Sequence, residues 1–180
     1  VVVQNLAPGA AARLGLSYAD LKAVKPDIIV CDISGYGDNG PYRDKKAYDL
    51  LIQSESGFVS VTGTEDTTSK AGPSIADIAA GMYAYTNILA ALLHRQQTGE
   101  GQHIDISMLE ALTEWMGYPL YYSLDGAEPP KRTGASHATI YPYGPFPAGD
   151  GKTVMLGLQN EREWKAFCTH VLMQPELADD

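Results

Sequence analysis

Residues 1–34, VVVQNLAPGAAARLGLSYADLKAVKPDIIVCDIS, decide the expected fold. A β-branched run, Val1–Gln4, opens the stretch, and a run with four consecutive apolar residues, Asp27–Ser34, closes it. Continuous apolar runs of this kind are typical of parallel strands buried on both faces. Between them, Ser17-Tyr-Ala-Asp20 resembles a capping box and predicts a short helix over Tyr18–Val24. Strand, helix and strand within about 30 residues form a βαβ unit, which predicts an α/β fold.

The strongest helical pattern in the chain lies over Ile75–Gln97 and predicts a buried helix. Apolar residues recur there at spacings of three and four, at Ile75, Ile78, Met82, Tyr85, Leu89 and Leu92. Gly99 is expected to end this helix as a C-cap. The alternating residues of Gly101–Ser107 predict a strand with one buried face, and a further helix is expected over Met108–Tyr118.

Weaker patterns divide the rest of the chain. The remaining expected elements are a helix over Tyr48–Ser56, a strand-like run over Phe58–Thr62, a strand over Val154–Leu158 and an amphipathic helix over Glu161–Val171. Gly126–Gly151 contains five Pro and five Gly and is expected to be an irregular connector. We therefore expect residues 1–125 to form part of a large α/β domain, and residues 126–180 to form the connector and the start of a smaller domain.

The composition excludes several classes of protein. Hydrophobic residues make up 44% and charged residues 19% of the 180 residues, which is the balance of a globular protein with a core. The net charge of −9 disfavours a nucleic-acid partner, and no apolar stretch is long enough and free enough of charge to predict a membrane span. Cys31 and Cys168 lack metal-type spacing, so we expect no metal site, a core role for Cys31 and a reducing, cytoplasmic setting.

Asp77 is the first candidate for chemistry because it stands at the start of the long helix, within GPSIADIAAG, residues 72–81. Unpaired backbone N–H groups and the helix dipole favour an anion there, and a carboxylate nucleophile must attack as the anion. An Asp at this position can equally do no more than cap the helix. The pattern by itself leaves both roles open.

Two loops that follow predicted strands are candidates for ligand binding, because ligands of α/β proteins bind beyond the carboxyl ends of strands. The segment Arg43–Tyr48 offers two lysines for phosphates and a tyrosine as a hydrogen-bond donor. The segment Asn5–Gly9, with Arg13 shortly after it, offers another phosphate contact. Each segment can equally be an ordinary solvated loop. His137 lies alone in the connector, and its role stays open.

Five stretches together resemble the family III CoA-transferases, also called the CaiB/BaiF family. In chain order they are VVVQNLAPGAAARLGLSYADL (1–21), KPDIIVCDISGYGDNGPY (25–42), AYDLLIQSESG (47–57), ADIAAGMYAYTNILAALLHRQQTGEGQHIDISM (76–108) and GASHATIYPYGPFPAGDG (134–151). Five matches in the family's order are far more specific than one. Family members are considerably longer than 180 residues, and the chain resembles their middle. The missing initiator Met and the opening within a predicted strand likewise suggest a segment of a longer protein.

The resemblance implies specific roles for single residues. The family's nucleophilic aspartate falls on Asp77. A tyrosine of the transferase branch falls on Tyr48, where racemases of the same family carry a catalytic histidine. Contacts to coenzyme A fall on Asn5, Leu6, Ala7, Arg13, Lys45, Lys46, Ala47 and Asp49. Coenzyme A takes part as a substrate, and the resemblance implies no metal and no further cofactor.

The reaction that the resemblance implies is transfer of coenzyme A from an acyl-CoA donor to a carboxylic acid, through an aspartyl anhydride and an aspartyl-CoA thioester. The stretches AYDLLIQSESG and SIADIAAGMYAY resemble members that act on small dicarboxylates. An acyl-CoA racemase of the same family is one rival hypothesis, although Tyr48 argues against it because a tyrosine titrating at about 10 is a poor base at neutral pH. A CoA-binding fragment without activity is a second hypothesis, and an unrelated α/β binding domain is a third.

The architecture that the resemblance implies is a Rossmann-like large domain with parallel strands, which binds coenzyme A, followed by a smaller domain. Two chains of a family member interlock in a homodimer, so we expect a homodimer here. The flexible Gly-rich loop that closes over the site in some of these transferases has no counterpart in this sequence. How reactive intermediates are shielded therefore does not follow from the resemblance.

Overall fold

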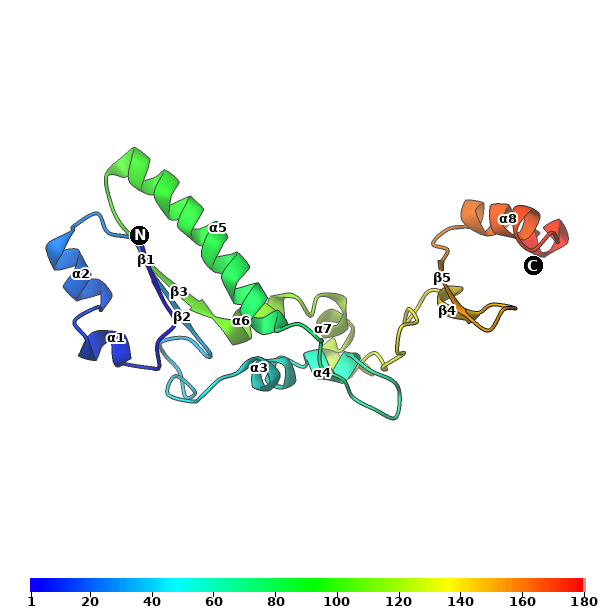
Figure 1. Ribbon diagram of the computed structural model, residues 1–180, viewed down its shortest axis with the longest axis horizontal. Helices are drawn as coiled ribbons and strands as arrows, with labels where there is room; N and C mark the ends of the chain where they lie inside the picture. The colour runs from blue at the N-terminus through cyan, green and yellow to red at the C-terminus, as the bar shows by residue number, and fades with distance from the viewer. Residues whose placement is uncertain (180) are drawn as a thin grey trace.

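The computed structural model describes residues 1–179 and contains a parallel sheet, a hairpin and the helices around them (Figure 1). The elements in chain order are β1 (Val2–Gln4), α1 (Ala10–Arg13), α2 (Tyr18–Val24), β2 (Val30–Ser34), α3 (Asp49–Glu55), α4 (Phe58–Val61), α5 (Ile75–Thr98), β3 (His103–Ser107), α6 (Met108–Glu114), α7 (Tyr118–Tyr122), η1 (Leu124–Gly126), β4 (Tyr143–Pro147), β5 (Thr153–Gly157), α8 (Glu161–His170) and η2 (Pro175–Asp179). The order β1–α2–β2 confirms the predicted βαβ unit, and the bounds of α2 are those predicted.

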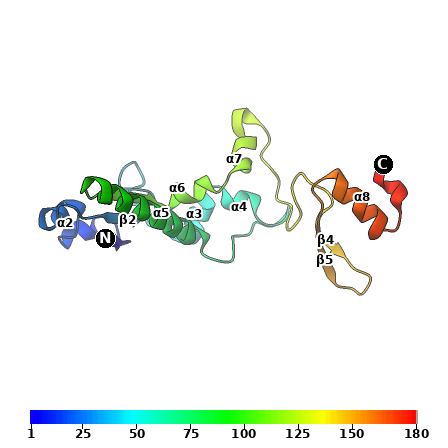
Figure 2. The same cartoon turned by 90° about the horizontal axis from the view of Figure 1, so that it is seen from above.

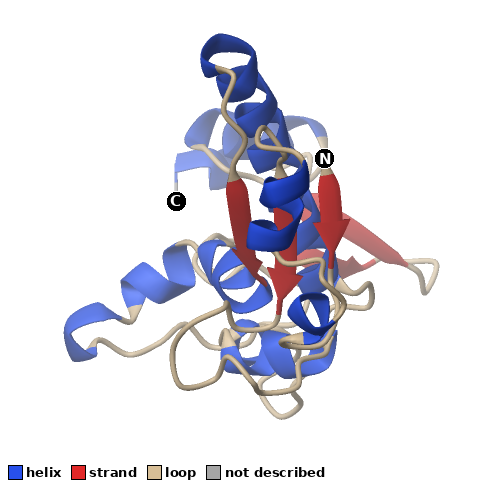
Figure 3. Ribbon diagram, turned by 90° about the vertical axis from the view of Figure 1, so that its left-hand side faces the viewer, coloured by secondary structure: helices blue, strands red, loops and turns tan. Residues whose placement is uncertain are grey.

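The sheet has the strand order β1–β2–β3, and all its strands run parallel (Figure 3). Val3 pairs with Cys31, and Cys31 pairs with Ile104 on its other side. The apolar run over residues 28–31 is buried, as predicted for a central strand. The parallel sheet with helices confirms the α/β class.

The core lies between α5 and the sheet. Cys31, Ala80, Ala84 and Ile106 form its buried centre. The buried residues of α5 are all alanines, whose small side chains let the helix approach the strands closely. Although α5 is long and apolar enough to cross a membrane by length and composition, its alanine face packs on β2 and β3, as the core helix of a globular domain does.

The prediction of α5 is confirmed for its extent and its end, and corrected for its buried face. Gly99 follows the helix with φ of 79°, in the left-handed conformation expected of a C-cap. The larger apolar residues that signalled the helix lie mostly on its exposed side: Ile78, Met82, Tyr85 and Leu89 are between 43% and 60% exposed. Periodicity identified the helix, and packing against the strands selected the alanine face.

The predicted strand over Phe58–Thr62 is wrong. Residues 58–61 form the short helix α4, and the Thr62 hydroxyl donates to the Phe58 carbonyl to close the turn. The Phe58 side chain packs against Ile52 and Ala76, between α3 and the start of α5. This tertiary contact outweighs the β-propensity of a short apolar run, because such runs do not distinguish strand from helix.

Two further boundaries differ from prediction. The helix expected over Met108–Tyr118 ends at Glu114, because Gly117 adopts φ of 51° and ψ of −126°, which redirects the chain into α7. The Gly- and Pro-rich connector contains the strand β4, which pairs antiparallel with β5. Pairing with β5 supplies the backbone hydrogen bonds that make β4 a strand, and a prediction from composition does not detect such a partner.

The C-terminal elements β4, β5, α8 and η2 lie apart from the parallel sheet in both views and are joined to it by residues 127–142 (Figures 1 and 2). The predicted strand and amphipathic helix are confirmed as β5 and α8. The Trp164 indole N–H donates to the Leu177 carbonyl at 3.1 Å, which ties α8 to η2. In the connector, the Arg132 guanidinium donates to the carbonyls of Thr64 and Glu65, both at 2.8 Å.

Candidate active site

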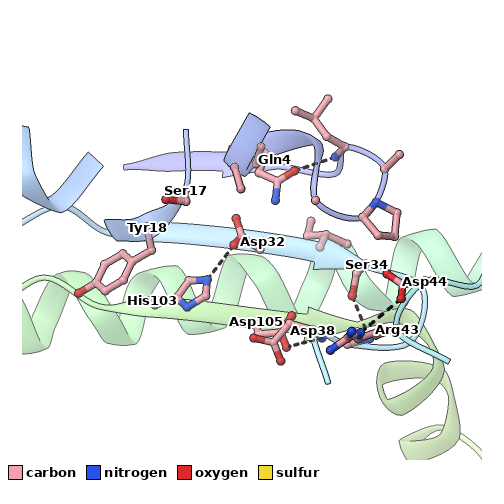
Figure 4. Close-up of a pocket in the computed structure, with 18 of the residues that line it drawn as sticks. Gln4, Ser17, Tyr18, Asp32, Ser34, Asp38, Arg43, Asp44, His103 and Asp105 are labelled. Atoms are coloured by element: carbon pink, nitrogen blue, oxygen red, sulfur yellow. Dashed lines mark hydrogen bonds and ion pairs between the residues drawn. The ribbon is translucent and has the colours of Figure 1, made fainter. Parts of the chain in front are cut away.

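A cavity of about 550 Å³ lies over the face of the parallel sheet opposite α5 and extends to the loops after β1 and β2 (Figure 4). Alternation along the strands directs Cys31, Ile104 and Ile106 towards α5. Their polar neighbours in the sequence, Asp32, His103 and Asp105, therefore line the cavity on the opposite face of the sheet. Only the part of the cavity at the loops after β1 and β2 is at the carboxyl ends of strands, where α/β proteins bind ligands.

Loops complete the wall of the cavity. Leu6 and Ala7, both predicted contacts of coenzyme A, line it from the turn after β1. The Gln4 side chain shapes that turn, since its amide oxygen accepts a hydrogen bond from the Leu6 N–H at 2.8 Å. Tyr18 closes the side next to α2, and its ring stacks on His103 at 5.1 Å between centroids. Further lining residues come from the loop after β2: Gly37, Asp38, Arg43 and Asp44.

Both basic side chains that line the cavity have a carboxylate partner. The His103 Nε2 lies 2.7 Å from the Asp32 carboxylate, and the Arg43 guanidinium lies 3.3 Å from Asp44. Burial raises the pKa of the Asp105 carboxyl and outweighs the hydrogen bond from the Asp38 N–H, which lowers this pKa. Carboxylates outnumber the cations along the wall, so the cavity itself favours uncharged parts of a ligand over phosphates.

The predicted phosphate contacts lie at the edge of the cavity or beyond it. Arg13 ends α1, and its guanidinium would lie 3.0 Å from a Cβ placed on Gly9, a lining residue. Asn5 is exposed in the same turn. Lys46 is also exposed, and nothing among residues 1–179 pairs with its ammonium group.

Lys45 differs from its neighbour because its ammonium group is engaged. It forms an ion pair with Glu55 and lies over the rings of Tyr42, at 4.4 Å from the centroid, and Tyr36, at 5.2 Å. The hydrogen bond with Glu55 raises the pKa of Lys45 and lowers the pKa of Glu55. This cluster fastens the loop after β2 to α3.

The remaining predicted residues gather where α3 meets the start of α5. Tyr48 precedes α3 with an extended backbone, and its side chain is 69% exposed. Ala47 packs against the buried cluster that contains Ala76. Asp49 accepts a hydrogen bond from the Ala76 N–H at 3.1 Å through its Oδ1. Asp77 follows in the first turn of α5 with an exposed side chain.

Asp77 lies in the first turn of α5, and this turn is at the carboxyl-terminal end of the parallel sheet (Figure 1). A short turn joins α5 to β3, so helix and strand run in opposite directions, and the first turn of α5 lies near the carboxyl end of β3 (Figure 1). Met108, directly after β3, packs in the same cluster as Ala76. Asp77 therefore lies towards the carboxyl ends of the strands, and it is not itself among the residues that line the cavity.

The comparison with known proteins decides the family. The family described as CoA-transferase family III matches residues 1–180. The chain belongs to this family. It is 38% identical over its whole length to a succinate–glutarate CoA-transferase of Agrobacterium fabrum, and 34% identical to an acetyl-CoA:oxalate CoA-transferase of Acetobacter aceti. It covers 45% and 46% of these two proteins, so the chain spans about half the length of the curated relatives it matches.

A solved structure supports the same assignment. The crystal structure of a CaiB/BaiF family protein from Brucella suis matches 99% of this family III chain and 47% of its own chain, with a TM-score of 0.83 and 35% sequence identity. The mixed α/β arrangement with a parallel sheet is therefore the one found in the CaiB/BaiF family.

Several residues of this family III cavity were not predicted. Asp32 lies in a run that was predicted to be buried on both faces, His103 and Asp105 lie in a strand predicted to have one buried face, and Ser17 and Tyr18 looked only like the start of a helix. A signal existed for the first three, because they are the polar partners of apolar residues in strands whose other face is buried. His137 lies elsewhere: its Nδ1 accepts hydrogen bonds from the Thr139 and Ile140 N–H groups, which shapes the connector.

Proposed function

We propose that the full-length protein transfers coenzyme A from an acyl-CoA donor to a small dicarboxylic acid, with Asp77 as the covalent nucleophile. The observation that carries the proposal is the state of Asp77 in a family III chain. Its carboxylate is exposed at the N-terminus of the long helix, and no hydrogen bond from residues 1–179 engages it. The relatives named for succinate, glutarate and oxalate support small dicarboxylates as the acids.

The first half of the reaction loads coenzyme A onto the protein. An Asp77 oxygen attacks the thioester carbonyl of the donor, the C–S bond breaks, and coenzyme A leaves as a thiolate. This step forms a mixed anhydride between Asp77 and the donor acyl group. The thiolate then attacks the aspartyl carbonyl, and the donor acid leaves as a carboxylate. Asp77 now carries coenzyme A as a thioester.

The second half runs the same steps in reverse order. The acceptor carboxylate attacks the aspartyl thioester, which forms a new anhydride and releases the thiolate. The thiolate attacks the acceptor acyl carbonyl of this anhydride. The acceptor leaves as its coenzyme A thioester, and the Asp77 carboxylate is restored. No proton is consumed or released over the cycle, and each step passes through a tetrahedral oxyanion.

The start of α5 is suited to oxyanions because of its unpaired N–H groups. The Ala76 N–H is occupied by Asp49, whereas nothing in the described part of the chain accepts from the N–H groups of Ile75 and Asp77. We assign these two donors to the oxyanion. The exposed Tyr48 hydroxyl orients the reacting carboxylate or thioester from the start of α3.

The proposed position of coenzyme A follows from the apolar and charged residues in and around the cavity. Its uncharged portions suit the cavity between Leu6, Ala7 and Tyr18, and its phosphates suit the exposed cations Arg13 and Lys46, which do not line the cavity. Assembly as a homodimer and a cytoplasmic setting remain part of the proposal. They follow from the family resemblance and the two thiols.

The proposal is tested by trapping the acylated carboxylate. The full-length protein is incubated with succinyl-CoA, quenched with hydroxylamine and digested, and the hydroxamate is located by mass spectrometry. We expect it on Asp77, and we expect Asp77→Asn to lower the transfer rate by at least about 10³-fold, because removal of a covalent nucleophile eliminates this route.

Asp20 provides the matched control because it occupies the same position in its helix, three residues after a serine cap. It should stay unmodified, and Asp20→Asn should retain the transfer rate. Hydroxamate on another residue, or full transfer by Asp77→Asn, rejects the assignment. Exchange of an α-proton of the acyl group in deuterated water, without transfer, identifies a racemase instead.

A further inference from the structure

Two helices of the chain begin with the same spacing of Ser and Asp but use it differently. In α2, the Ser17 Oγ accepts from the Asp20 N–H and the Asp20 carboxylate accepts from the Ser17 N–H, each at 3.2 Å. In α5, the Ser74 side chain makes no capping bond, and Asp77 does not bond back to the Ser74 N–H within the described residues. Spacing alone therefore does not decide whether the acid caps its own helix.

The conformation before α5 explains the difference. Ser17 is extended, with ψ of 159°, as a capping box requires, whereas Ser74 has ψ of 75°. Two side chains of α3 hold the backbone on either side of Ser74. The Asp49 Oδ1 accepts from the Ala76 N–H at 3.1 Å, and the Gln53 Oε1 accepts from the Ala71 N–H at 2.8 Å.

These two anchors form one rigid unit. The Gln53 Nε2 donates to the Asp49 Oδ2 at 2.8 Å, so both Asp49 oxygens are occupied. Gln53 is fully buried, as are Ile52, Ala76 and Leu112, which pack α3 against the start of α5. A buried amide that is hydrogen-bonded through both its oxygen and its nitrogen leaves this unit little freedom to rearrange.

We infer that Asp49 is a positioning residue: it caps α5 from a neighbouring helix and thereby keeps the Asp77 carboxylate unbonded and exposed for attack. This inference rests on the proposed function, because it assigns Asp49 a part in that reaction. Without the anchor, an acid at the third position of a helix folds back onto the N-cap N–H, as Asp20 does. A carboxylate held in this way is turned from the substrate and its lone pairs are engaged.

The kinetic test separates positioning from direct binding of coenzyme A. In the full-length protein we expect Asp49→Ala to lower kcat by about 100-fold and to change the KM for acyl-CoA by less than about threefold. Asp49→Asn should be intermediate. Its amide oxygen still accepts from Ala76, but its NH₂ group faces the Gln53 NH₂ group and breaks the chain of bonds to Ala71.

A second substitution tests whether Asp77 withdraws in the absence of Asp49. Ser74 has φ of −72°, which proline also adopts, and proline offers no N–H for Asp77 to accept from. Adding Ser74→Pro to Asp49→Ala should therefore recover at least about 10-fold in kcat. Loss of stability alone predicts no such recovery, because the second substitution restores no contact.

The controls distinguish failure of the inference from failure of the proposed function. Hydroxylamine trapping on the unsubstituted protein comes first, and absence of label on Asp77 rejects the proposed function itself. If Asp77 is labelled, then wild-type kcat in Asp49→Ala, a loss expressed in KM alone, or no recovery by Ser74→Pro overturns the inference. Glu163→Ala is a control in another helix. Glu163 lies three residues after the N-cap of α8, as Asp77 does in α5, and it accepts a hydrogen bond from the Gln159 N–H. This substitution should lower the melting temperature without changing kcat.

Discussion

Lys45 and Lys46 are adjacent in the sequence, yet their ammonium groups have opposite surroundings. Lys45 is paired with Glu55 and lies over two tyrosine rings, whereas Lys46 is exposed without a partner among the described residues. A lysine in an ion pair must break that pair before it can bind a phosphate, whereas an unpaired lysine can bind a phosphate directly. Both lysines were predicted contacts, and the structure favours Lys46 for this role.

Substitution of each lysine should separate binding from stability. Lys46→Ala should raise the Kd for coenzyme A by about 10-fold, the value of one charge-assisted hydrogen bond. Lys45→Ala should change this Kd less and lower the melting temperature more, because it leaves Glu55 unpaired. Isothermal titration and thermal melting measure the two effects, and the reverse ranking in Kd contradicts the assignment.

The Asp105 carboxyl should make stability depend on pH. Burial raises its pKa in the folded state, so its contribution to stability is present at low pH and is lost as the pH rises through the folded pKa. Asp105→Asn should therefore raise the melting temperature at pH 7. The corresponding gain in the free energy of unfolding should be less than about 1 kcal/mol, because the carboxyl group is partly exposed. The gain should vanish near pH 4.

Asp150 serves as the control for this pH effect. The Lys152 N–H lowers its pKa, so its contribution is present at neutral pH and is lost as the pH falls. Asp150→Asn should not raise the melting temperature at pH 7. An equal gain from both substitutions indicates a general effect of removing negative charge from a protein with net charge −9.

At the scale of elements, α5 shows why a helix is easier to predict than its buried face. Both its alanines and its larger apolar residues recur with helical spacing, so either face satisfies the pattern. The sheet selects the alanines, since Ala80 and Ala84 touch Cys31 and Ile106 at close range. No other part of residues 1–179 covers the larger apolar residues on the other side of α5, and they are exposed.

Substitutions on the two faces should therefore have unequal costs. Ala80→Leu adds volume where the side chain is 1% exposed and should destabilise the protein by about 1–3 kcal/mol. Met82→Leu, on the exposed face, should change stability by less than about 0.5 kcal/mol. Chemical denaturation measures both values, and equal costs indicate that the buried face is assigned wrongly.

At the scale of the whole molecule, the chain leaves an unusual amount of apolar surface uncovered. Ile78, Met82, Tyr85, Leu89 and Leu93 are all exposed along one side of α5. Contiguous apolar surface of this kind ordinarily contacts further protein. The chain spans about half the length of its curated relatives, and we expect residues outside 1–180 to cover this side of α5 in a full-length protein.

Residues 1–180 produced alone should accordingly bind a hydrophobic dye more strongly than the full-length protein. We expect the fluorescence of bound anilinonaphthalene sulfonate, compared at equal molar concentration, to be several-fold higher for the shorter chain. Replacing Met82 and Tyr85 by Gln in residues 1–180 should lower the signal. Equal fluorescence of the two proteins, with both folded by circular dichroism, contradicts this expectation.

The sequence by itself determined the elements whose signals are local. The apolar runs of the βαβ unit, the capping box of α2 and the extent of α5 can be recognised from neighbours a few residues away, and the structure confirms all three. The family was likewise evident from the order of five stretches, and it is confirmed over residues 1–180. The roles of the predicted site residues stay predictions.

Only the tertiary structure decided which partners those residues have. Residues 58–61 form a helix, residues 143–147 of the connector form a strand, and the larger apolar residues on one side of α5 are exposed. Each of these outcomes depends on contacts between residues that are distant in the sequence. The same reason separates Asp20 from Asp77. Their local patterns are alike, and Asp49, a residue 27 positions before Ala76, caps the second helix. Local spacing indicates which hydrogen bonds a side chain can form, and the fold determines which of them it forms.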